Sequence, residues 1–515
     1  MAGSSESVSQ GTTRSAGTEA RAGRTDRSVL SPVVAFAGLG VATVLIVSVW
    51  LFDVPFLLSK GQVIVTAIAL TSLGLLCTKL MARDRPVRRA LASLQLGPWM
   101  GVGFTAGFGV ATLAWLAGDL SYRGIVTSLS LTGGAVIAAI GFVAATVGYL
   151  TVPTFSRSWA ARLDHRARGA LTFRPRASTV WKLFLIAMAG YALQFMTGTV
   201  GYLSDPSAAL STTSSSGALF AAMTQLGLLA TLVAAWRYAT LRTGGSIALL
   251  AVVSLSQISI GLFSGVKEAG IVQLLAVVIG LSALGRLKVR PLIAAGLITF
   301  FVITPLVSTY RQLVVVGSSR LTASQVIDTV DLGSVISSAL GADDPNGRVG
   351  TSSWGRWSRL GDVAIIVNQS PSPIPFASPT ELLVAPILGF VPRSIWPDKP
   401  VLDAGYQINQ LYYHSAPGSY SSAAATPYGD LFRHGGIPVV LLGMVLFGGL
   451  LRLVDSRPPR GGSNDPRVLF LPMLLFTGVV KQEVDYVGFT ASLLLTLVTY
   501  VVAVRVTRSR QGATE

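Results

Sequence analysis

Basic side chains beside an aromatic residue make residues 390–400, FVPRSIWPDKP, the segment of this sequence best suited to chemistry. Arg393, Lys399 and Trp396 lie there among three prolines. Proline restricts the backbone, and guanidinium groups suit bidentate recognition of phosphate. We therefore expect a stiff cationic segment that binds a phosphate-bearing ligand.

Further basic residues lie at the ends of apolar segments or in the same long region between them. They are Lys267, Arg311, Arg320, Arg348, Arg356, Arg359 and Arg433. Any one of them has an ordinary alternative role, which is to reach toward lipid phosphates or to form a surface ion pair. As a group, they indicate a site for a phosphate group near a membrane surface.

Carboxylates and histidines in the same part of the chain are candidate proton acceptors. They are Asp430, Glu483, Asp485, His414 and His434. A carboxylate at the end of a helix bundle would act as a general base toward a hydroxyl group if burial raised its pKa. The other acidic pair, Asp343 and Asp344, lies in a Gly- and Asn-containing stretch that is typical of a turn.

The composition is that of a membrane protein. Of the 515 residues, 51% are hydrophobic and 12% are charged, and the mean hydropathy is +0.61. The single cysteine, Cys77, lies in an apolar segment, which excludes an intramolecular disulfide and a redox pair of thiols. The sequence has no P-loop, HExxH or CxxC motif. We therefore expect neither a bound metal nor a nucleotide cofactor.

Apolar runs of about twenty residues, long enough to cross a bilayer, predict twelve membrane helices. Their ranges are 32–52, 62–79, 98–118, 130–152, 180–203, 217–236, 245–263, 269–285, 291–308, 436–451, 467–483 and 487–504. Lys481, Glu483 and Asp485 separate the last two, which leaves open a re-entrant hairpin at 467–504. The predicted fold class is an all-α polytopic membrane protein.

The positions of the basic residues give the predicted topology. With the N-terminus in the cytoplasm, most of the 40 Lys and Arg residues fall on the cytoplasmic side, as the positive-inside rule requires. The net charge of +17 is therefore a topology signal and does not indicate nucleic-acid binding. Both termini are expected in the cytoplasm.

This topology divides the chain into five parts. They are a disordered cytoplasmic tail at 1–30, a transmembrane bundle at 31–308, one large extracytoplasmic loop at 309–435, transmembrane helices at 436–505 and a short cytoplasmic tail at 506–515. Within the loop we expect a helix at 321–340, a turn at 343–355 and a short apolar helix or strand at 381–390.

Five motifs in order, SGVKEAG, TPLVSTYRQL, RWSRLGDVAIIVNQSPSPIPF, GFVPRSIWPDKP and TPYGDLFRHGG, resemble the bacterial O-antigen polymerase (Wzy-type) family. The resemblance covers roughly residues 264–436, and FVPRSIWPDKP is its most specific part. Two positions depart from the family pattern, which often has Arg in place of Lys267 and Glu in place of Asp430. The resemblance implies an oligosaccharide repeat unit polymerase with a GT-C-like glycosyltransferase architecture in the bacterial plasma membrane.

The resemblance also implies roles for particular residues. Lys267, Arg311, Arg359 and Arg393 would hold the leaving pyrophosphate of an undecaprenyl-pyrophosphate-linked glycan. Asp430, or else Glu483, would accept the proton of the attacking sugar hydroxyl. Further contacts to the substrate would come from Arg356, Trp396, Lys399, Arg433 and His434. The implied partners are the lipid bilayer, a chain-length regulator and a repeat-unit flippase.

Two other functions remain open at this stage. One is an O-antigen ligase or another lipid-phosphate-sugar glycosyltransferase, which would have the same architecture and a different acceptor. The other is a transporter or flippase of lipid-linked sugars. Transporters usually show internal repeats and broken helices with charges at the midplane, whereas this sequence has no matching halves and its charges gather outside the apolar runs.

Overall fold

The structure is a computed structural model. It describes residues 59–82, 86–116, 128–168, 176–200, 214–282, 358–391, 404–415, 425–456 and 465–507, with short pieces at 306–307, 309–311, 315–316, 319–320, 333, 395–396 and 423. The predicted helix at 321–340 and the predicted turn at 343–355 lie outside the described residues, apart from Gly333.

The regular secondary structure of the described chain is helical, apart from one pair of strands of two residues each. Its first half contains α2 (Ser59–Met81), α3 (Val87–Ala92), α4 (Leu96–Phe104), η1 (Thr105–Gly109), η2 (Val110–Leu116), α5 (Ser128–Thr151), α6 (Thr154–Arg168), α7 (Ala177–Met196), α9 (Ser214–Leu241), α10 (Gly244–Phe263) and α11 (Lys267–Ser282). Its second half contains β1 (Val315–Val316), β2 (Ser319–Arg320), α17 (Leu360–Gln369), α18 (Thr380–Phe390), α19 (Ala404–Leu411), α20 (Pro427–Arg433), α21 (Gly436–Asp455), η5 (Pro466–Leu469), α22 (Phe470–Val480) and α23 (Tyr486–Val506). The two strands are antiparallel, with Val315 opposite Arg320.

Seven of the described helices are long and apolar enough to cross a membrane. They are Lys60–Met81, Leu131–Thr151, Ala177–Met196, Gly217–Leu241, Gly244–Phe263, Gly436–Asp455 and Tyr486–Val506. Each coincides with a predicted span, so the all-α polytopic membrane class is confirmed. The predicted spans at 32–52 and, apart from 306–307, at 291–308 lie outside the described residues.

Three further predicted spans are not among these seven helices. The one at 269–285 corresponds to α11, whose described part ends at Ser282, and the one at 467–483 corresponds to η5 followed by the 11 residues of α22. The described part of the span at 98–118 is helical throughout, but α4 passes into the π-helical turn η1 and then the 3-10 helix η2. This stretch contains GVGFTAGFG, and its glycines let the backbone approach neighbouring helices closely.

The glycines of α4 and η1 place this interrupted helix against two elements that carry polar groups. A Cβ atom on Gly103 would lie 2.1 Å from the carbonyl oxygen of Val480, the last residue of α22. In the π-helical turn, the Gly107 carbonyl accepts a hydrogen bond of 3.0 Å from the backbone N–H of Arg359. The irregular backbone therefore positions both Arg359 and the end of α22.

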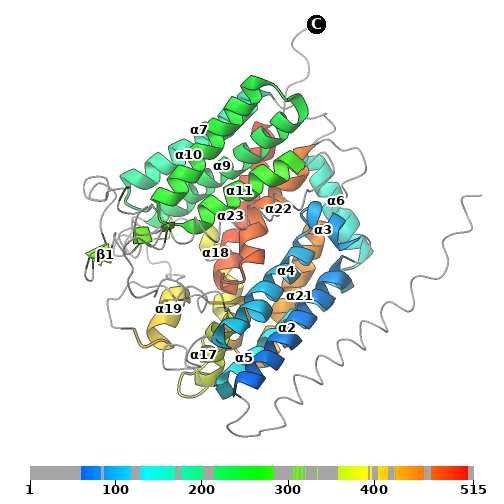
Figure 1. Ribbon diagram of the computed structural model, residues 1–515, viewed down its shortest axis with the longest axis vertical. Coiled ribbons are helices and arrows are strands. Elements are labelled where there is room, and N and C mark those ends of the chain that lie inside the picture. The colour runs from blue at the N-terminus through cyan, green and yellow to red at the C-terminus, as the bar shows by residue number, and fades with distance from the viewer. Residues whose placement is uncertain are drawn as a thin grey trace, which may run out of the picture.

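One end of the bundle is tied together by Asp455, the last residue of α21. Its carboxylate accepts hydrogen bonds from the backbone N–H groups of Leu96 and Gly97, at 2.8 and 2.9 Å, and from the hydroxyl of Tyr149 at 2.9 Å. A carboxylate at the first turn of α4 also interacts favourably with the helix dipole. Figure 1 shows α3 and α6 at this end, and α17 and α19 at the opposite end.

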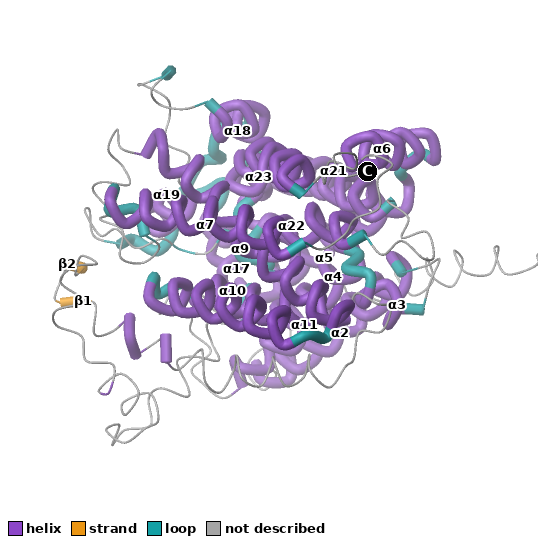
Figure 2. Tube along the Cα trace, turned by 90° about the horizontal axis from the view of Figure 1, so that it is seen from above, coloured by secondary structure: helices purple, strands orange, loops and turns teal. Residues whose placement is uncertain are grey.

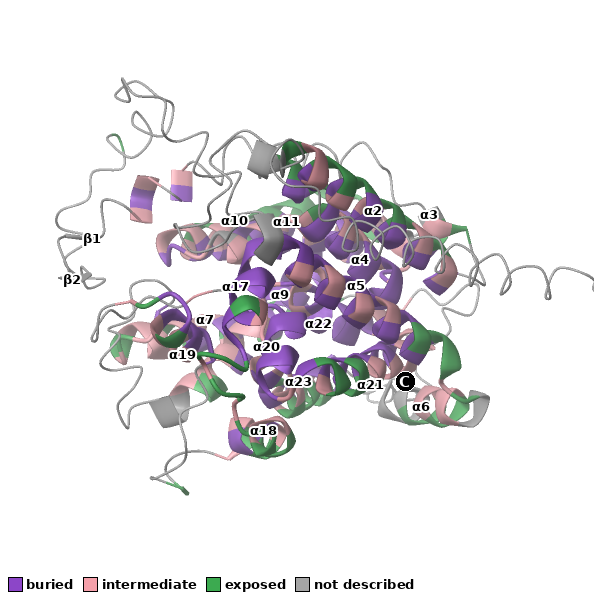
Figure 3. Cartoon of the chain, turned by 90° about the horizontal axis from the view of Figure 1, so that it is seen from below, coloured by how far each residue is buried: buried purple, intermediate pink, exposed green. Residues whose placement is uncertain are grey.

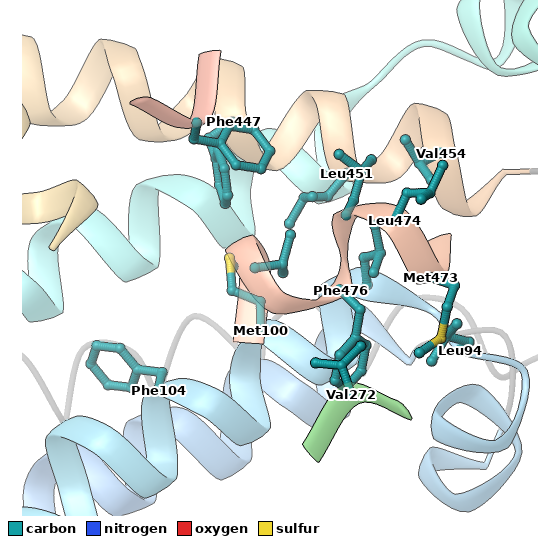
Figure 4. Close-up of a cluster of buried hydrophobic side chains, with 14 of the residues drawn as sticks. Leu94, Met100, Phe104, Val272, Phe447, Leu451, Val454, Met473, Leu474 and Phe476 are labelled. Atoms are coloured by element: carbon teal, nitrogen blue, oxygen red, sulfur yellow. The ribbon is translucent and has the colours of Figure 1, made fainter. Parts of the chain in front are cut away.

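Buried apolar side chains concentrate on the central helices, which Figure 3 colours as buried along α9, α17, α20 and α22. Figure 4 shows side chains of α22, among them Leu474 and Phe476, between α21 and α4. Phe447 and Leu451 of α21 face them from one side and Met100 of α4 from the other. This packing places the C-terminal end of α22 inside the bundle.

Helices α5 and α21 touch backbone to backbone through two reciprocal glycines. A Cβ atom on Gly448 would lie 1.8 Å from the Ala145 carbonyl oxygen, and one on Gly148 would lie 2.0 Å from the Val445 carbonyl oxygen. Small residues are the usual means of close helix packing in membranes. The contact fixes α21, which begins two residues after His434.

A pair of alanine substitutions tests this contact. Gly448→Ala is expected to destabilise the protein by roughly 1–3 kcal/mol, because the added methyl group overpacks the crossing. Gly449→Ala is the matched control, since the atom nearest to its added Cβ is a methyl carbon of Val152 at 3.4 Å. The thermal unfolding midpoints of both variants in detergent should be compared with that of the wild type. Equal midpoints for the two variants would contradict the close contact.

Candidate active site at the end of the helix bundle

The short turn between α22 and α23, residues 481–485, is where most of the polar groups meet. Its Lys481 lies 2.7 Å from the Glu268 carboxylate of α11 and also pairs with Glu483. The Gln482 side-chain oxygen accepts a hydrogen bond of 2.9 Å from the hydroxyl of Tyr428 in α20. The turn therefore joins α11 and α20, which are far apart in the sequence.

Arg359 is the centre of an ion-pair network on this turn, which we call the Arg359 network. It consists of Glu268, Arg359, Asp362, Lys481 and Glu483. The Arg359 guanidinium pairs with Glu483 and lies 3.4 Å from the Asp362 carboxylate. The side chains of Arg359 and Glu483 are 14% and 19% exposed, so the network is only partly accessible.

A second group of charges, which we call the Asp430 cluster, lies beside it. It consists of Glu381, Asp430, Arg433 and His434. The Asp430 carboxylate is 0% exposed and accepts a hydrogen bond of 2.7 Å from the Arg433 Nε. Its other oxygen accepts one of 3.0 Å from the backbone N–H of Val487, at the start of α23. Both oxygens of Asp430 are therefore engaged.

Helix α20 positions the charged members of this cluster. The Thr426 side chain caps the helix by accepting a hydrogen bond from the Gly429 N–H, and Pro427 suits the first helical position. Asp430 and Arg433 are three residues apart and so lie on one face of the helix. His434 follows directly, and its Nδ1 lies 2.7 Å from the Asp430 carbonyl oxygen, to which it donates when protonated.

Glu381 is the most exposed member of the Asp430 cluster. Its side chain is 35% exposed, and its Oε2 lies 3.3 Å from the His434 Nε2 and 3.6 Å from an Arg433 guanidinium nitrogen. When His434 Nδ1 donates to the Asp430 carbonyl, the neutral ring has its lone pair at Nε2, facing Glu381. A hydrogen bond between Nε2 and the Glu381 carboxylate therefore requires a proton on one of the two groups.

Helix α19 lies against both groups of charges. The Tyr413 hydroxyl donates a hydrogen bond of 2.7 Å to Asp362 of the Arg359 network. The Gln407 side-chain oxygen accepts one of 3.2 Å from Arg433 of the Asp430 cluster. The two groups therefore form one continuous polar region that includes the turn at 481–485.

The electrostatics of this region reflect burial in an apolar bundle. Burial, together with the nearby Asp430 carboxylate, raises the pKa of the Asp485 carboxyl to about 6. Burial lowers the pKa of Arg433, but the charge and hydrogen bond of Asp430 together with the charge of Glu381 outweigh this, and the net shift of the pKa is upward. Arg433 thus stays protonated.

Several residues that the sequence predicts for the site lie in this region. Arg359, Asp430, Arg433, His434 and Glu483 all belong to the two groups described above. Arg311 lies near the neighbouring turn at 264–266, where its Nε donates a hydrogen bond of 2.7 Å to the Gly265 carbonyl. Lys267 is the first residue of α11 and follows that turn directly.

Of the other residues with a role implied by the resemblance, only Trp396 is described. Trp396 is described and is 43% exposed, without a ring contact to the two groups of charges. Arg356, Arg393 and Lys399 lie outside the described residues. Among the described residues, no group of three His, Cys, Asp or Glu side chains is arranged to hold a metal ion.

Sequence reasoning missed Glu381, Asp362, Gln407 and the role of Glu268 as the partner of Lys481. Glu381 and Asp362 each lie in the first turn of a short apolar helix, where an acidic residue is ordinarily explained by the helix dipole. The sequence offered one sign of each residue, a single carboxylate at the start of an apolar run. Gln407 gave no signal, because its role depends on how α19 packs against α20.

Comparison with known protein families finds one match. A domain of unknown function (DUF8712) matches residues 180–458, which is more than half of the chain. The chain belongs to the DUF8712 family. No curated protein and no solved structure matches it. The DUF8712 region contains the Asp430 cluster and Arg359, but it ends before the turn at 481–485, which completes the Arg359 network.

The pairing of Asp430 with Arg433 gives a prediction about stability. Asp430→Asn is expected to destabilise the protein by roughly 3–5 kcal/mol, because a buried Arg433 loses its main partner. Adding Arg433→Gln should restore much of the loss, since neither charge then remains buried. Thermal unfolding of both single variants and the double variant measures the coupling. Additive losses would contradict a direct pair.

Proposed function

We propose that this DUF8712 protein is a membrane glycosyltransferase that polymerises polysaccharide. It would transfer a growing glycan from undecaprenyl pyrophosphate to a lipid-linked oligosaccharide repeat unit at the outer face of the bacterial plasma membrane. The observation that carries the proposal is Arg359, which two carboxylates hold partly buried at one end of an apolar helix bundle. The motif resemblance to O-antigen polymerases supports the same reaction.

The proposed topology extends the seven described spans to twelve, in a GT-C-like arrangement with both termini in the cytoplasm. The hydrogen bonds to the Asp455 carboxylate would then lie on the cytoplasmic side, and the polar region around 481–485 on the outer side. The described helices support this, because α5 and α21 end at the Asp455 tie while α22 ends, and α23 begins, at the polar region. A chain-length regulator and a repeat-unit flippase are the proposed protein partners.

Arg359 is the proposed ligand of the pyrophosphate. Its present partners, Asp362 and Glu483, are carboxylates, and phosphate oxygens form the same bidentate hydrogen bonds with a guanidinium group. Lys481 neutralises part of the negative charge of Glu268 and Glu483 nearby. Arg311, Arg393 and Lys267 are proposed to add positive charge as the bond between the sugar C1 and the pyrophosphate oxygen breaks.

Glu381 and His434 together are the proposed proton acceptor. Asp430 is enclosed by Arg433 and the Val487 N–H, so we propose that it positions His434 and Arg433. Glu381 is the accessible carboxylate beside the imidazole. The acceptor sugar hydroxyl would lose its proton to this pair while its oxygen forms the new bond to the donor sugar C1.

Buried polar atoms near α17 and α19 support a ligand with many hydroxyl groups. The Ser358 hydroxyl, the Gln369 side-chain oxygen and the Asn409 side-chain nitrogen are buried without a hydrogen-bond partner among the described residues. An unsatisfied buried polar group costs about 1–3 kcal/mol. The hydroxyl groups of a bound glycan would satisfy these atoms, as ordered water would in its absence.

Alanine variants of the proposed pyrophosphate ligands test the function. Arg359→Ala and Arg393→Ala should each leave the protein in the membrane but reduce polymerisation about a hundred-fold or more. In a deletion strain, these variants should leave single repeat units on the lipid carrier and no long surface polysaccharide. Arg505→Ala, at the other end of α23, is the control. Normal chain lengths in both test variants would refute the assigned roles.

A conservative change tests the proposed proton acceptor. Glu381→Gln keeps the shape of the side chain but removes its ability to take a proton, so turnover should fall by about a hundred-fold or more with little change in substrate binding. Purified protein and lipid-linked repeats would give the rate and the affinity. Ser378→Ala is a nearby exposed control. A wild-type rate for Glu381→Gln would assign the proton transfer to another group.

A further inference from the structure

Helix α18 is a short apolar helix that does not cross the bundle. It has 11 residues, Thr380–Phe390, and after Glu381 in its first turn it contains no charged residue. At about 1.5 Å per residue its length is roughly 16 Å, about half of the hydrocarbon thickness of a bilayer. Figure 2 shows it beside α23 at the edge of the molecule.

One side of α18 packs on the first turns of the membrane span α23. Ala385 and Leu382 contact Val487 and Ala491 in a small apolar cluster. A Cβ atom on Gly389 would lie 2.0 Å from the Ala491 carbonyl oxygen, so the two backbones touch there. Close contact through small residues is the packing that membrane helices use.

The direction of α18 follows from contacts near its two ends. Glu381 lies beside His434, and the adjacent Asp430 binds the N–H of Val487 at the start of α23. Gly389 lies beside Ala491, which is one turn further along α23. Helix α18 therefore runs along the outside of the bundle away from the polar region, in the same sense as α23.

The other side of α18 is apolar and uncovered. Leu383, Ile387 and Phe390 are 78%, 59% and 50% exposed and are spaced to lie on one face of the helix. Figure 3 shows exposed residues along this outer side of α18. Most exposed residues further along α23, among them Leu494 and Leu497, are also apolar, and Ser492 is the polar exception next to Ala491. The exposed face of α18 thus accompanies the exposed apolar side of a helix long enough to span the membrane.

We propose that α18 is a re-entrant helix inserted in the bilayer, and that its exposed face contacts the hydrocarbon chains of lipids. If α18 lay in water, its exposed apolar side chains would be hydrated. Hydration of apolar surface costs free energy in proportion to the exposed area. Insertion places the start of α18 at the level of the lipid head groups. Glu381, Arg433 and His434 then adjoin the membrane itself and not the bulk solvent.

Consequently, part of the predicted extracytoplasmic loop at 309–435 re-enters the membrane. A substrate with a lipid tail would reach the Asp430 cluster sideways from the bilayer, along α18. The inference rests on the packing and exposure of α18 and does not depend on the proposed function.

Single spin labels in liposomes test the insertion. The one native cysteine, Cys77, is buried and can be changed to alanine, after which Leu383→Cys, Ile387→Cys and Phe390→Cys are labelled one at a time. These positions are exposed, so a label there disturbs no packing. Leu497→Cys on α23 is the control in lipid, and Ser372→Cys in the preceding loop is the control in water.

Collision rates of each label with oxygen and with a water-soluble nickel complex give its surroundings. The ratio of the oxygen rate to the nickel rate should be several-fold higher at 383, 387 and 390 than at 372, should resemble that at 497, and should rise from 383 to 390. Ratios like that at 372 would place α18 in water and overturn the proposal. Low rates with both reagents would mean that protein covers the face, which would overturn it as well.

Discussion

The structure of the polar region depends on burying an ion pair in an apolar bundle. Asp430 and Arg433 lie almost completely out of contact with solvent, where isolated charges are very costly. The pair is tolerated because each partner has further hydrogen bonds, Asp430 from the Val487 N–H and Arg433 to Gln407. These bonds join α19, α20 and α23 into one unit. The short helix α20 thus has a fixed place although it has only seven residues.

The Arg359 network depends on a departure from regular helix geometry. The π-helical turn at Thr105–Gly109 presents the Gly107 carbonyl to the backbone of Arg359, and Gly103 brings the same stretch against the end of α22. The turn at 481–485 then supplies Glu483 to the Arg359 guanidinium. Insertions in a helix of this kind are often found at functional sites. Here the insertion holds two segments, about 120 positions apart in the sequence, next to each other.

The sequence was sufficient to predict the class of fold and several of the charged residues that the structure brings together in the candidate site. Apolar runs of membrane length identified each of the seven described spans, because hydrophobicity over some twenty residues depends little on tertiary contacts. Arg359, Glu483, Asp430 and His434 were recognised from their charge, their location between spans and the motif resemblance. The change of helix type within 98–118 was not predicted, because an apolar run alone does not distinguish α-, π- and 3-10 helices. Glu381 was missed because its partners, Arg433 and His434, lie more than fifty residues away in the chain.

The join between α20 and α21 determines how the charged cluster is attached to the rest of the bundle. Gly435 and Gly436 both have positive φ values, 155° and 69°, which residues other than glycine rarely adopt. Beyond them α21 is fixed, first by its glycine contact with α5 and then by Asp455 at its far end. Helix α21 is therefore held along its length, and the two glycines form the sharp change of direction between it and α20. The Asp430 cluster is thus attached to the bundle through a backbone join that few residues other than glycine could form.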